Sequence, residues 1–244
     1  MKPALFLKKF YEKLYAAYGP QGWWPLLDYK GTNPTKTGSV KGYHPGDYSI
    51  PRNKREQFEI CAGAILTQNT SWVQVEKALQ ALKNRGALDP KKIIAMPQAE
   101  LAGAIKPAGY FNQKAKKLKI FANFYLTLGK GTPSREELLS VWGVGPETAD
   151  SMLLYAYKAP TFVVDAYTKR ILGRMGLVGT DADYDEVKMF FEKNLACDLK
   201  TYQEFHALLV EHAKRRCSAR SPLCGECLAG KNCKTAKYFK PRKV

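Results

Sequence analysis

The sequence predicts an all-α protein, and three observations support that class. Almost every long segment repeats its apolar residues at helical spacing, and none shows the alternation of a half-buried strand. Helix start and stop residues bound these segments, as Ser71 and Gly86 do around one of them. The chain has 244 residues, of which 45% are apolar, so it can bury one large core or two small ones.

The predicted elements follow one another along the chain. Residues 1–18 form an amphipathic helix that carries Leu5, Phe6, Phe10, Leu14 and Tyr15 on one side. A buried helix begins near Gln57, and Ser71 is expected to cap the helix that ends at Gly86. Further helices are expected over 97–105, 112–128, 134–141, 146–156, 166–175, 183–195 and 200–216.

Two segments lack helical periodicity. Residues 29–53 are rich in Gly, Pro, Ser, Thr and Asn and should form a long loop. The chain after Arg216 is short, basic and rich in cysteine.

The charge of the chain favours a polyanionic partner. It has 39 Lys and Arg against 22 Asp and Glu, a net charge of +17. Phosphates are the usual reason for such an excess, although a solvated Lys-rich surface gives the same total. No run of about 18 apolar residues could span a membrane, and the N-terminus lacks the features of a signal peptide. We expect a cytoplasmic protein, or a nuclear or organellar one in a eukaryote.

Four cysteines lie within 17 residues at the spacing C-x6-C-x2-C-x5-C: Cys217, Cys224, Cys227 and Cys233. Four thiolates this close can bind a [4Fe-4S] cluster or a tetrahedral zinc ion. Zinc sites usually pair two C-x-x-C knuckles, whereas only one is present here, which favours the larger cluster. Two disulfides are the alternative in an oxidising compartment. Cys61 and Cys197, on apolar helical faces, are expected in the core.

A tight turn, Trp142-Gly143-Val144-Gly145, joins two predicted helices. Its two glycines let the backbone approach a ligand closely, and Pro146 suits the first position of the following helix. A glycine turn before a helix N-terminus can bind an anion, although such turns also occur without one.

Asp165 stands before the helix 166–175, where a carboxylate can simply be an N-cap. Together with the turn and the cysteines, however, the sequence Val163-Val164-Asp165 resembles the helix-hairpin-helix DNA glycosylase superfamily. The cysteine spacing matches the iron–sulfur loop of the endonuclease III and adenine-mismatch glycosylase group. This resemblance implies that Gly143, Val144 and Gly145 bind one DNA phosphate and that Asp165 is the catalytic acid.

The same resemblance implies the architecture and the cofactor. It predicts two helical lobes with a DNA cleft between them and Asp165 at their seam. One lobe is a helical barrel of residues 56–158 that includes the hairpin 134–156, and the other combines 1–55 with 159–244. In this family a [4Fe-4S] cluster, here in the loop 217–233, shapes a basic surface that touches DNA. Arg215, Arg216, Arg220, Lys231 and Lys234 could supply that surface.

Bifunctional members of the family carry a lysine in the pattern G-V-G-x-K-T-A, where this chain has Gly143-Val144-Gly145-Pro146-Glu147-Thr148-Ala149. A carboxylate cannot form a Schiff base with the sugar. Glu147 therefore predicts a monofunctional glycosylase.

The N-terminal half resembles the endonuclease III-related 3-methyladenine DNA glycosylases. The similar stretches are Gly22–Pro25, Ala64–Trp72 and Lys106–Lys116, and some members of that subgroup lack the cluster. The resemblance implies that Trp24 and Trp72 sandwich the flipped base, with Trp23 beside them, and that Gln68 or Asn69 wedges into the duplex. Core aromatics and a helix C-cap are the alternatives.

The sequence therefore predicts a base-excision-repair enzyme that acts as a monomer on damaged double-stranded DNA, with alkylated purines as its substrates. One alternative is a glycosylase for oxidised, deaminated or mismatched bases, with or without weak lyase activity. Another is a non-catalytic DNA-binding or redox-sensing iron–sulfur protein. His206 and His212 are expected to be structural, and the basic stretch Lys114, Lys116, Lys117 and Lys119 could meet DNA or be a solvated face.

Overall fold

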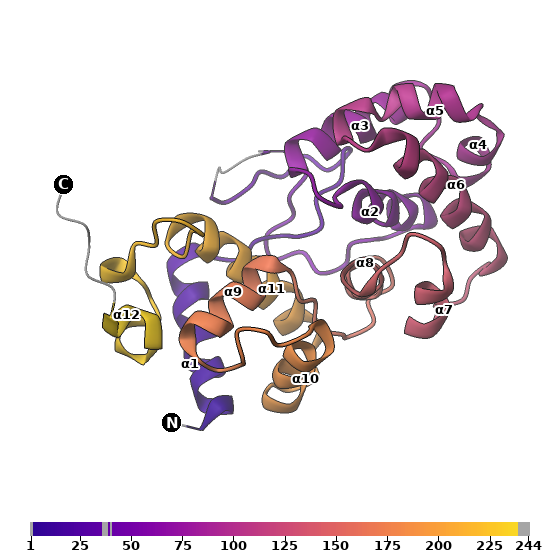
Figure 1. Ribbon diagram of the computed structural model, residues 1–244. Coiled ribbons are helices and arrows are strands. Elements are labelled where there is room, and N and C mark those ends of the chain that lie inside the picture. The colour runs from indigo at the N-terminus through magenta and orange to yellow at the C-terminus, as the bar shows by residue number, and fades with distance from the viewer. Residues whose placement is uncertain (1, 36–38, 40, 239–244) are drawn as a thin grey trace. The chain divides into compact units, whose positions relative to one another are not determined.

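The computed structural model describes residues 2–35, 39 and 41–238, apart from the side chains of Lys231, Lys237 and Tyr238. Over these ranges the protein is helical, which confirms the predicted class (Figure 1). The same ranges contain no strand, only an isolated antiparallel bridge between Thr32 and Lys41. None of the described helices is both long enough and apolar enough to cross a membrane.

The chain divides into two compact units. The terminal unit combines residues 1–21 with 160–244, and the central unit spans 22–159. The sequence placed residues 22–55 with the termini, whereas they belong to the central unit. The reason is local packing: Leu26 and Ile50 are buried, and the backbone N–H of Leu27 donates to Glu59 at 2.6 Å.

Helix α2 (Lys54–Leu66) is the core of the central unit. Nine consecutive residues, 58–66, are buried, so this helix is enclosed on all sides rather than amphipathic. The small residues Ala62, Gly63 and Ala64 let neighbouring side chains approach its backbone closely. The elements that follow α2 in this unit are α3 (Trp72–Asn84), α4 (Pro90–Ala95), α5 (Gln98–Ala104), η1 (Lys106–Ala108), α6 (Phe111–Thr127), α7 (Arg135–Ser140), α8 (Pro146–Ser151) and η2 (Met152–Ala156).

Aromatic side chains form the core of the terminal unit. Phe162 stacks on Phe191 with ring centroids 3.8 Å apart, and Phe205 meets Phe191 edge-on at 5.6 Å. These rings join the segment before α9 to α10 and α11. The helices of this unit are α1 (Pro3–Tyr18), α9 (Ala166–Met175), α10 (Tyr184–Asn194), α11 (Leu199–Arg215) and α12 (Lys234–Tyr238), with short turns η3 (Cys224–Glu226) and η4 (Gly230–Asn232).

Several details differ from the prediction. The helix Pro90–Ala95 was missed because six residues with only Ile93 buried are too short to show periodicity. In α1 the buried side includes Leu7, whereas Leu5 is 46% exposed. The segment predicted as one helix over 146–156 changes at Met152 into a π-helical turn. The side chain of Ser71 makes no capping hydrogen bond.

Candidate active site and cysteine loop

The hairpin is built from α7, a glycine turn and α8. Ser134 begins α7 with a capping box, in which its hydroxyl accepts from Glu137 N and Glu137 accepts from Ser134 N. Gly143 has φ +88°, and a Cβ there would lie 2.5 Å from Lys117 Cγ. Gly145 is the extended N-cap of α8, and a Cβ there would meet nothing within 4 Å. The backbone at Gly145 is therefore open to a ligand, whereas the Val144 side chain is buried.

Gln68 ties the end of α2 to this hairpin. Its Nε2 donates to Gly143 O and to Thr148 Oγ1, both at 3.0 Å, and its Oε1 accepts from Lys117 Nζ at 2.5 Å. An amide held at both ends is not free to enter a duplex. Asn69 is exposed and has φ +53°, so of the two residues it is the one that projects from the surface.

The basic stretch on α6 is mostly structural. Lys114 is 2% exposed and donates to Leu66 O at 2.8 Å and to Ala108 O at 2.7 Å. Burial lowers its pKa to about 8. Lys119 donates to Ile94 O. The Lys116 ammonium instead lies 4.7 Å from the ring centroid of Trp142, which is 51% exposed beside the glycine turn.

The predicted base-pocket tryptophans form one cluster. Trp24 meets Trp72 edge to face, with centroids 5.2 Å apart and planes at 86°, so the two rings are not parallel and contact each other directly. Trp23 meets Trp24 at 6.2 Å and 79°, and Tyr155 closes the cluster 5.3 Å from Trp24. A Cβ at Gly63 would lie 2.9 Å from Trp24 Nε1, so glycine is what admits the ring.

The indole Nε1 of Trp24 is buried and has no hydrogen-bond partner among the described residues. Leaving a buried donor unpaired costs about 1–3 kcal/mol. The unpaired N–H therefore destabilises the folded protein, and binding of a group that accepts a hydrogen bond from Trp24 Nε1 would be favoured.

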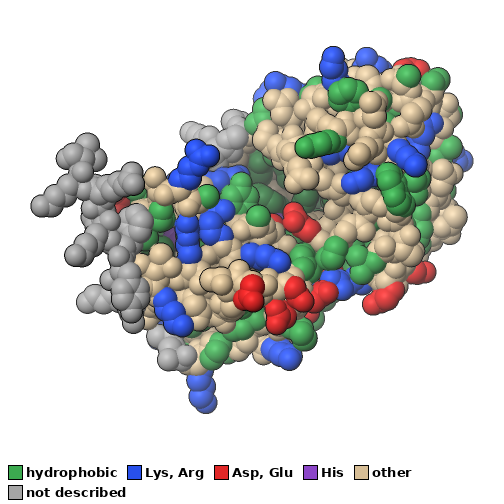
Figure 2. All heavy atoms as spheres, in the orientation of Figure 1, with side chains coloured by type: hydrophobic (Ala, Val, Ile, Leu, Met, Phe, Trp, Pro, Cys, Tyr) green, Lys and Arg blue, Asp and Glu red, His purple; other side chains and the backbone are tan. Residues whose placement is uncertain are grey.

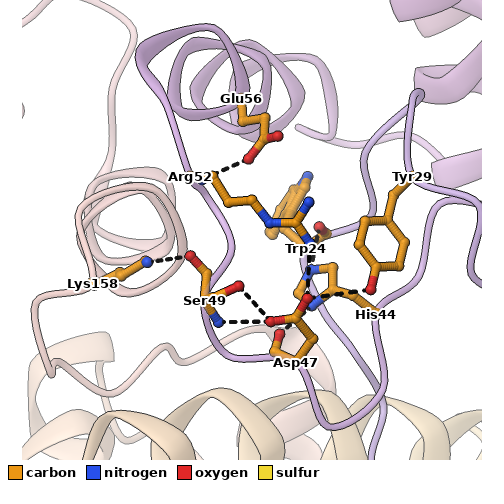
Figure 3. A network of polar contacts seen from close by, with 8 residues as sticks. All are labelled: Trp24, Tyr29, His44, Asp47, Ser49, Arg52, Glu56 and Lys158. Carbon is orange, nitrogen blue, oxygen red and sulfur yellow. Dashed lines mark hydrogen bonds and ion pairs between the residues drawn. The ribbon is translucent and has the colours of Figure 1, made fainter.

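The loop that carries Trp23 and Trp24 is anchored by a polar network (Figure 3). His44 lies between two carbonyl groups, with Nε2 2.9 Å from Trp24 O and Nδ1 2.8 Å from Asp47 O. The pKa of Asp47 is well below its usual range. The largest cause is the pair of hydrogen bonds from the Ser49 side chain and backbone, and a smaller one is the hydrogen bond from Arg52. The network fixes the backbone of Trp24 although it lies in a segment without regular secondary structure.

Asp165 is the N-cap of α9, as predicted. Its Oδ1 accepts the backbone N–H of Thr168 at 2.7 Å. Its Oδ2 lies 3.8 Å from His206 Nε2. Burial by itself raises the pKa of this carboxyl, but the interactions with His206 and with the Thr168 backbone outweigh it, so the pKa is lowered. The site therefore holds an ionised carboxylate with one oxygen fixed by a helix.

Sequence reasoning did not connect His206 with Asp165. The two residues are 41 positions apart (206 − 165) on different helices, and no spacing links them. Only the packing of α9 against α11 brings them together. Glu147, in contrast, is exposed in the first turn of α8, so the lyase position of the family pattern carries a carboxylate.

The four cysteines of the loop are free thiols, and three of them lie beside Arg174 or His212. Arg174 Nη1 donates to Cys217 Sγ at 3.3 Å and to Ser218 O at 2.7 Å, while its own carbonyl accepts from Cys233 Sγ at 3.3 Å. Cys227 Sγ lies 3.3 Å from His212 Nε2. Cys217, Cys227 and Cys233 thus lie near the C-terminal ends of α9 and α11.

The four cysteines are the donor set that a metal centre in this loop would use. Among the described residues, no three His, Cys, Asp or Glu side chains are placed to hold one metal ion. A [4Fe-4S] cube gives each iron its own cysteine, so its four thiolates need not converge on one point. Burial raises the pKa of Cys227, and the nearby Cys217 and Cys233 thiols add to this effect. A metal centre binds thiolates, so its binding to these cysteines would release protons.

The remaining two cysteines lie outside this group. Cys61 is buried, as predicted. Cys197 is exposed, so its expected place in the core is wrong. It lies in the short connection between α10 and α11 rather than on a packed helical face.

The helical hairpin, the capped acid and the cysteine loop together define a base-excision DNA glycosylase. Residues 62–197 match the family model described as HhH-GPD superfamily base excision DNA repair protein. The chain belongs to this superfamily, and it is a DNA repair glycosylase of that class.

Individual relatives agree with that assignment. A Methanocaldococcus jannaschii protein named as a candidate DNA repair glycosylase is 41% identical over 230 residues, 90% of this chain and 91% of that protein. An endonuclease III trapped as a covalent intermediate on DNA shares the fold, with a TM-score of 0.76, 20% identity and coverage of 98% and 99% of the two chains. The H. pylori 3-methyladenine DNA glycosylase bound to 1,N6-ethenoadenine has a TM-score of 0.66 and 28% identity over 88% of this chain and 98% of that one.

Proposed function

We propose that the protein is a monofunctional glycosylase that releases alkylated purines from double-stranded DNA, with Asp165 as its catalytic residue. The observation that carries this proposal is the environment of Asp165: a carboxylate kept ionised despite burial, with Oδ1 held by the helix cap. Its other oxygen, Oδ2, faces His206 rather than the cap.

The reaction breaks the bond between C1′ of the deoxyribose and the purine nitrogen. The bonding electrons leave with the base, and positive charge develops on C1′ and O4′. An ionised Asp165 stabilises that charge. Water then adds to C1′ and loses a proton, which the same carboxylate can accept. The base must first be flipped out of the duplex to bring C1′ to the carboxylate.

The tryptophan cluster supports an alkylated purine as the substrate. An alkylated purine carries positive charge, and the face of an aromatic ring attracts a cationic base more strongly than it attracts a neutral base. The cluster of Trp23, Trp24, Trp72 and Tyr155 offers several such faces in one place. Because Trp24 and Trp72 now touch edge to face, binding of a base between them requires one ring to turn. That movement would also expose the unpaired Trp24 N–H to an acceptor on the base.

Two surfaces of the central unit are proposed to hold the DNA. The backbone of Gly143, Val144 and Gly145 binds one phosphate, and Asn69 takes the place of the flipped base in the duplex. Gln68 supports both, because it joins the end of α2 to the hairpin. Figure 2 shows exposed Lys and Arg side chains on each of the two units, and the net charge of +17 is in keeping with a polyanionic partner.

Glu147 supports a monofunctional reaction, since no amine is present at the family's lysine position. Lyase activity is the second candidate, because the endonuclease III with the same fold was trapped covalently on DNA. The carboxylate at Glu147 favours the monofunctional reaction over lyase activity.

We also propose that the cysteine loop binds a [4Fe-4S] cluster through Cys217, Cys224, Cys227 and Cys233. The cluster would supply structural cross-linking of the loop rather than bond cleavage. Zinc is the competing metal, and the iron and sulfide content of the purified protein separates the two. We expect the protein to act as a monomer in the cytoplasm at the nucleoid, or in the nucleus or an organelle of a eukaryote.

A panel of lesion duplexes tests the substrate assignment. The duplexes carry 3-methyladenine, 7-methylguanine, thymine glycol, uracil or hypoxanthine, and released base is measured under single-turnover conditions. We expect release of the methylated purines and little release of the others. Release of only thymine glycol or uracil would contradict the substrate assignment but not the glycosylase class.

A further inference from the structure

The side chain of His206 approaches the carboxylate of Asp165 within the terminal unit. His206 lies on α11, which packs against α9, and its Nε2 is 3.8 Å from Asp165 Oδ2. The two side chains are 4% and 13% exposed. Because both residues belong to one compact unit, the fold of that unit alone sets this contact.

The two oxygens of Asp165 have different partners. Oδ1 accepts the Thr168 N–H at 2.7 Å, which fixes the carboxyl group on the end of α9. Oδ2 faces His206 at a distance longer than a hydrogen bond but short enough for an ion pair. His206 is therefore the side chain placed to influence the oxygen that the cap does not use.

We propose that His206 is a positioning residue: it stabilises the negative charge of Asp165 and orients Oδ2 toward C1′ of the sugar. The inference rests on the proposed function, because it gives His206 its role through Asp165. Nothing in the contact requires His206 to touch the substrate.

The physical reason lies in the burial of the carboxylate. Lost hydration favours the protonated acid, and burial alone would raise the pKa of Asp165. His206 is the largest of the interactions that lower it again. A protonated Asp165 could neither stabilise charge on C1′ nor accept a proton from water. Removal of His206 should therefore inactivate the enzyme selectively at low pH.

Other titratable groups on the packed elements face different partners. Tyr11 of α1 meets the ring of Phe205 at 5.3 Å. Tyr18, at the end of α1, lies 3.0 Å from His212 Nδ1. Tyr184 of α10 accepts from Val164 N at 3.3 Å. The basic side chains of α9 donate to backbone carbonyls: Lys169 to Ala182, Arg170 to Cys217 and Arg174 to Ser218.

The experiment compares the full chain with His206→Phe, His206→Gln and Leu209→Ala. Phenylalanine removes the donor, glutamine keeps an N–H donor, and Leu209 is a fully buried residue of the same helix that controls for lost packing. Base release from a methylated-purine duplex is measured in single turnover from about pH 4 to about pH 9, which spans the ordinary carboxyl and imidazole pKa values.

We expect the acid limb of the pH profile of His206→Phe to move upward by about one unit, so that release on that limb falls about tenfold relative to the alkaline plateau. His206→Gln, which carries no positive charge, should show the same upward shift. Leu209→Ala should lower thermal stability and leave the limb in place. An unshifted limb in His206→Phe would overturn the proposal, as would an equal loss of activity at every pH.

A second readout needs no substrate. The carboxyl carbon of Asp165, followed by NMR during an acid titration, reports its pKa in the free protein. The pKa should rise in both His206→Phe and His206→Gln, and an unchanged pKa overturns the proposal. If the wild-type protein releases no damaged base, the proposed function fails, but this titration still decides the role of His206.

Discussion

At the scale of single residues, the site depends on side chains that do more than one task. Asp165 caps α9 and also presents Oδ2 in a buried setting. Gln68 was predicted as one of two wedge candidates, but its amide is occupied by the hairpin and by Lys117. The sequence could name these residues, because their neighbours in the chain are distinctive. It could not show which of their atoms are already engaged.

Gln68→Leu should weaken DNA binding and lower stability. The substitution leaves Gly143 O and the Lys117 ammonium without their partner, at a cost of about 1–3 kcal/mol in unfolding free energy. Chemical denaturation and binding to an abasic-site duplex measure the two effects. Gln80→Leu, which removes an exposed contact with Asn84 on α3, is the control and should change neither. Wild-type DNA affinity in Gln68→Leu would show that the hydrogen bonds of Gln68 do not support DNA binding by the hairpin.

Glu147→Lys tests the basis of the monofunctional assignment. A lysine here would place an amine at the lyase position, where it can form a Schiff base with the sugar. Borohydride should then trap the variant on damaged DNA well above the wild-type level. Glu147→Gln serves as the matched control without an amine. Trapping of the wild-type protein at the level of Glu147→Lys would contradict a monofunctional enzyme.

At the scale of elements, the apolar pattern predicted most helices and the long loop. Amphipathic helices such as α3 bury one face at helical spacing, and the fully buried α2 is a run of mostly apolar residues. Short or irregular elements were missed. The helix Pro90–Ala95 has one buried residue, and the π-helical turn Met152–Ala156 is a continuous run of buried apolar residues, in which no period is visible. The contact between Asp165 and His206 could not be predicted, because it depends on how α9 packs against α11. The edge-to-face arrangement of Trp24 and Trp72 likewise depends on Gly63 of α2.

Cys224→Ser should remove the cluster and loosen the loop. We expect loss of bound iron and of brown colour, lower thermal stability, and weaker DNA binding, because metal binding and loop folding are coupled. The rate of base release from saturated complexes should change much less. Cys197→Ser, which alters an exposed cysteine outside the quartet, should retain full iron content. Iron content unchanged in Cys224→Ser would exclude that residue as a ligand.

At the scale of the whole molecule, the +17 charge should make DNA binding strongly dependent on salt. Each phosphate contact releases condensed counterions, so the logarithm of the affinity should fall linearly with the logarithm of salt concentration, with a slope near −0.9 per contact. Fluorescence anisotropy with an undamaged duplex measures it. Lys116→Ala should make the slope less negative by about one if this side chain beside Trp142 meets a phosphate. A slope near zero would contradict an electrostatic DNA interface.

We expect Asp165 to perform base release in an enzyme that binds damaged DNA. The most direct test of this role is single-turnover release of a methylated purine by Asp165→Asn beside a binding measurement on the same duplex. Asparagine can still accept the Thr168 hydrogen bond but carries no charge. We predict a loss of about 10²–10³-fold in release, the usual range for removing one electrostatic contribution to a transition state, with DNA affinity within about twofold of wild type. Release at the wild-type rate would contradict a catalytic role for Asp165.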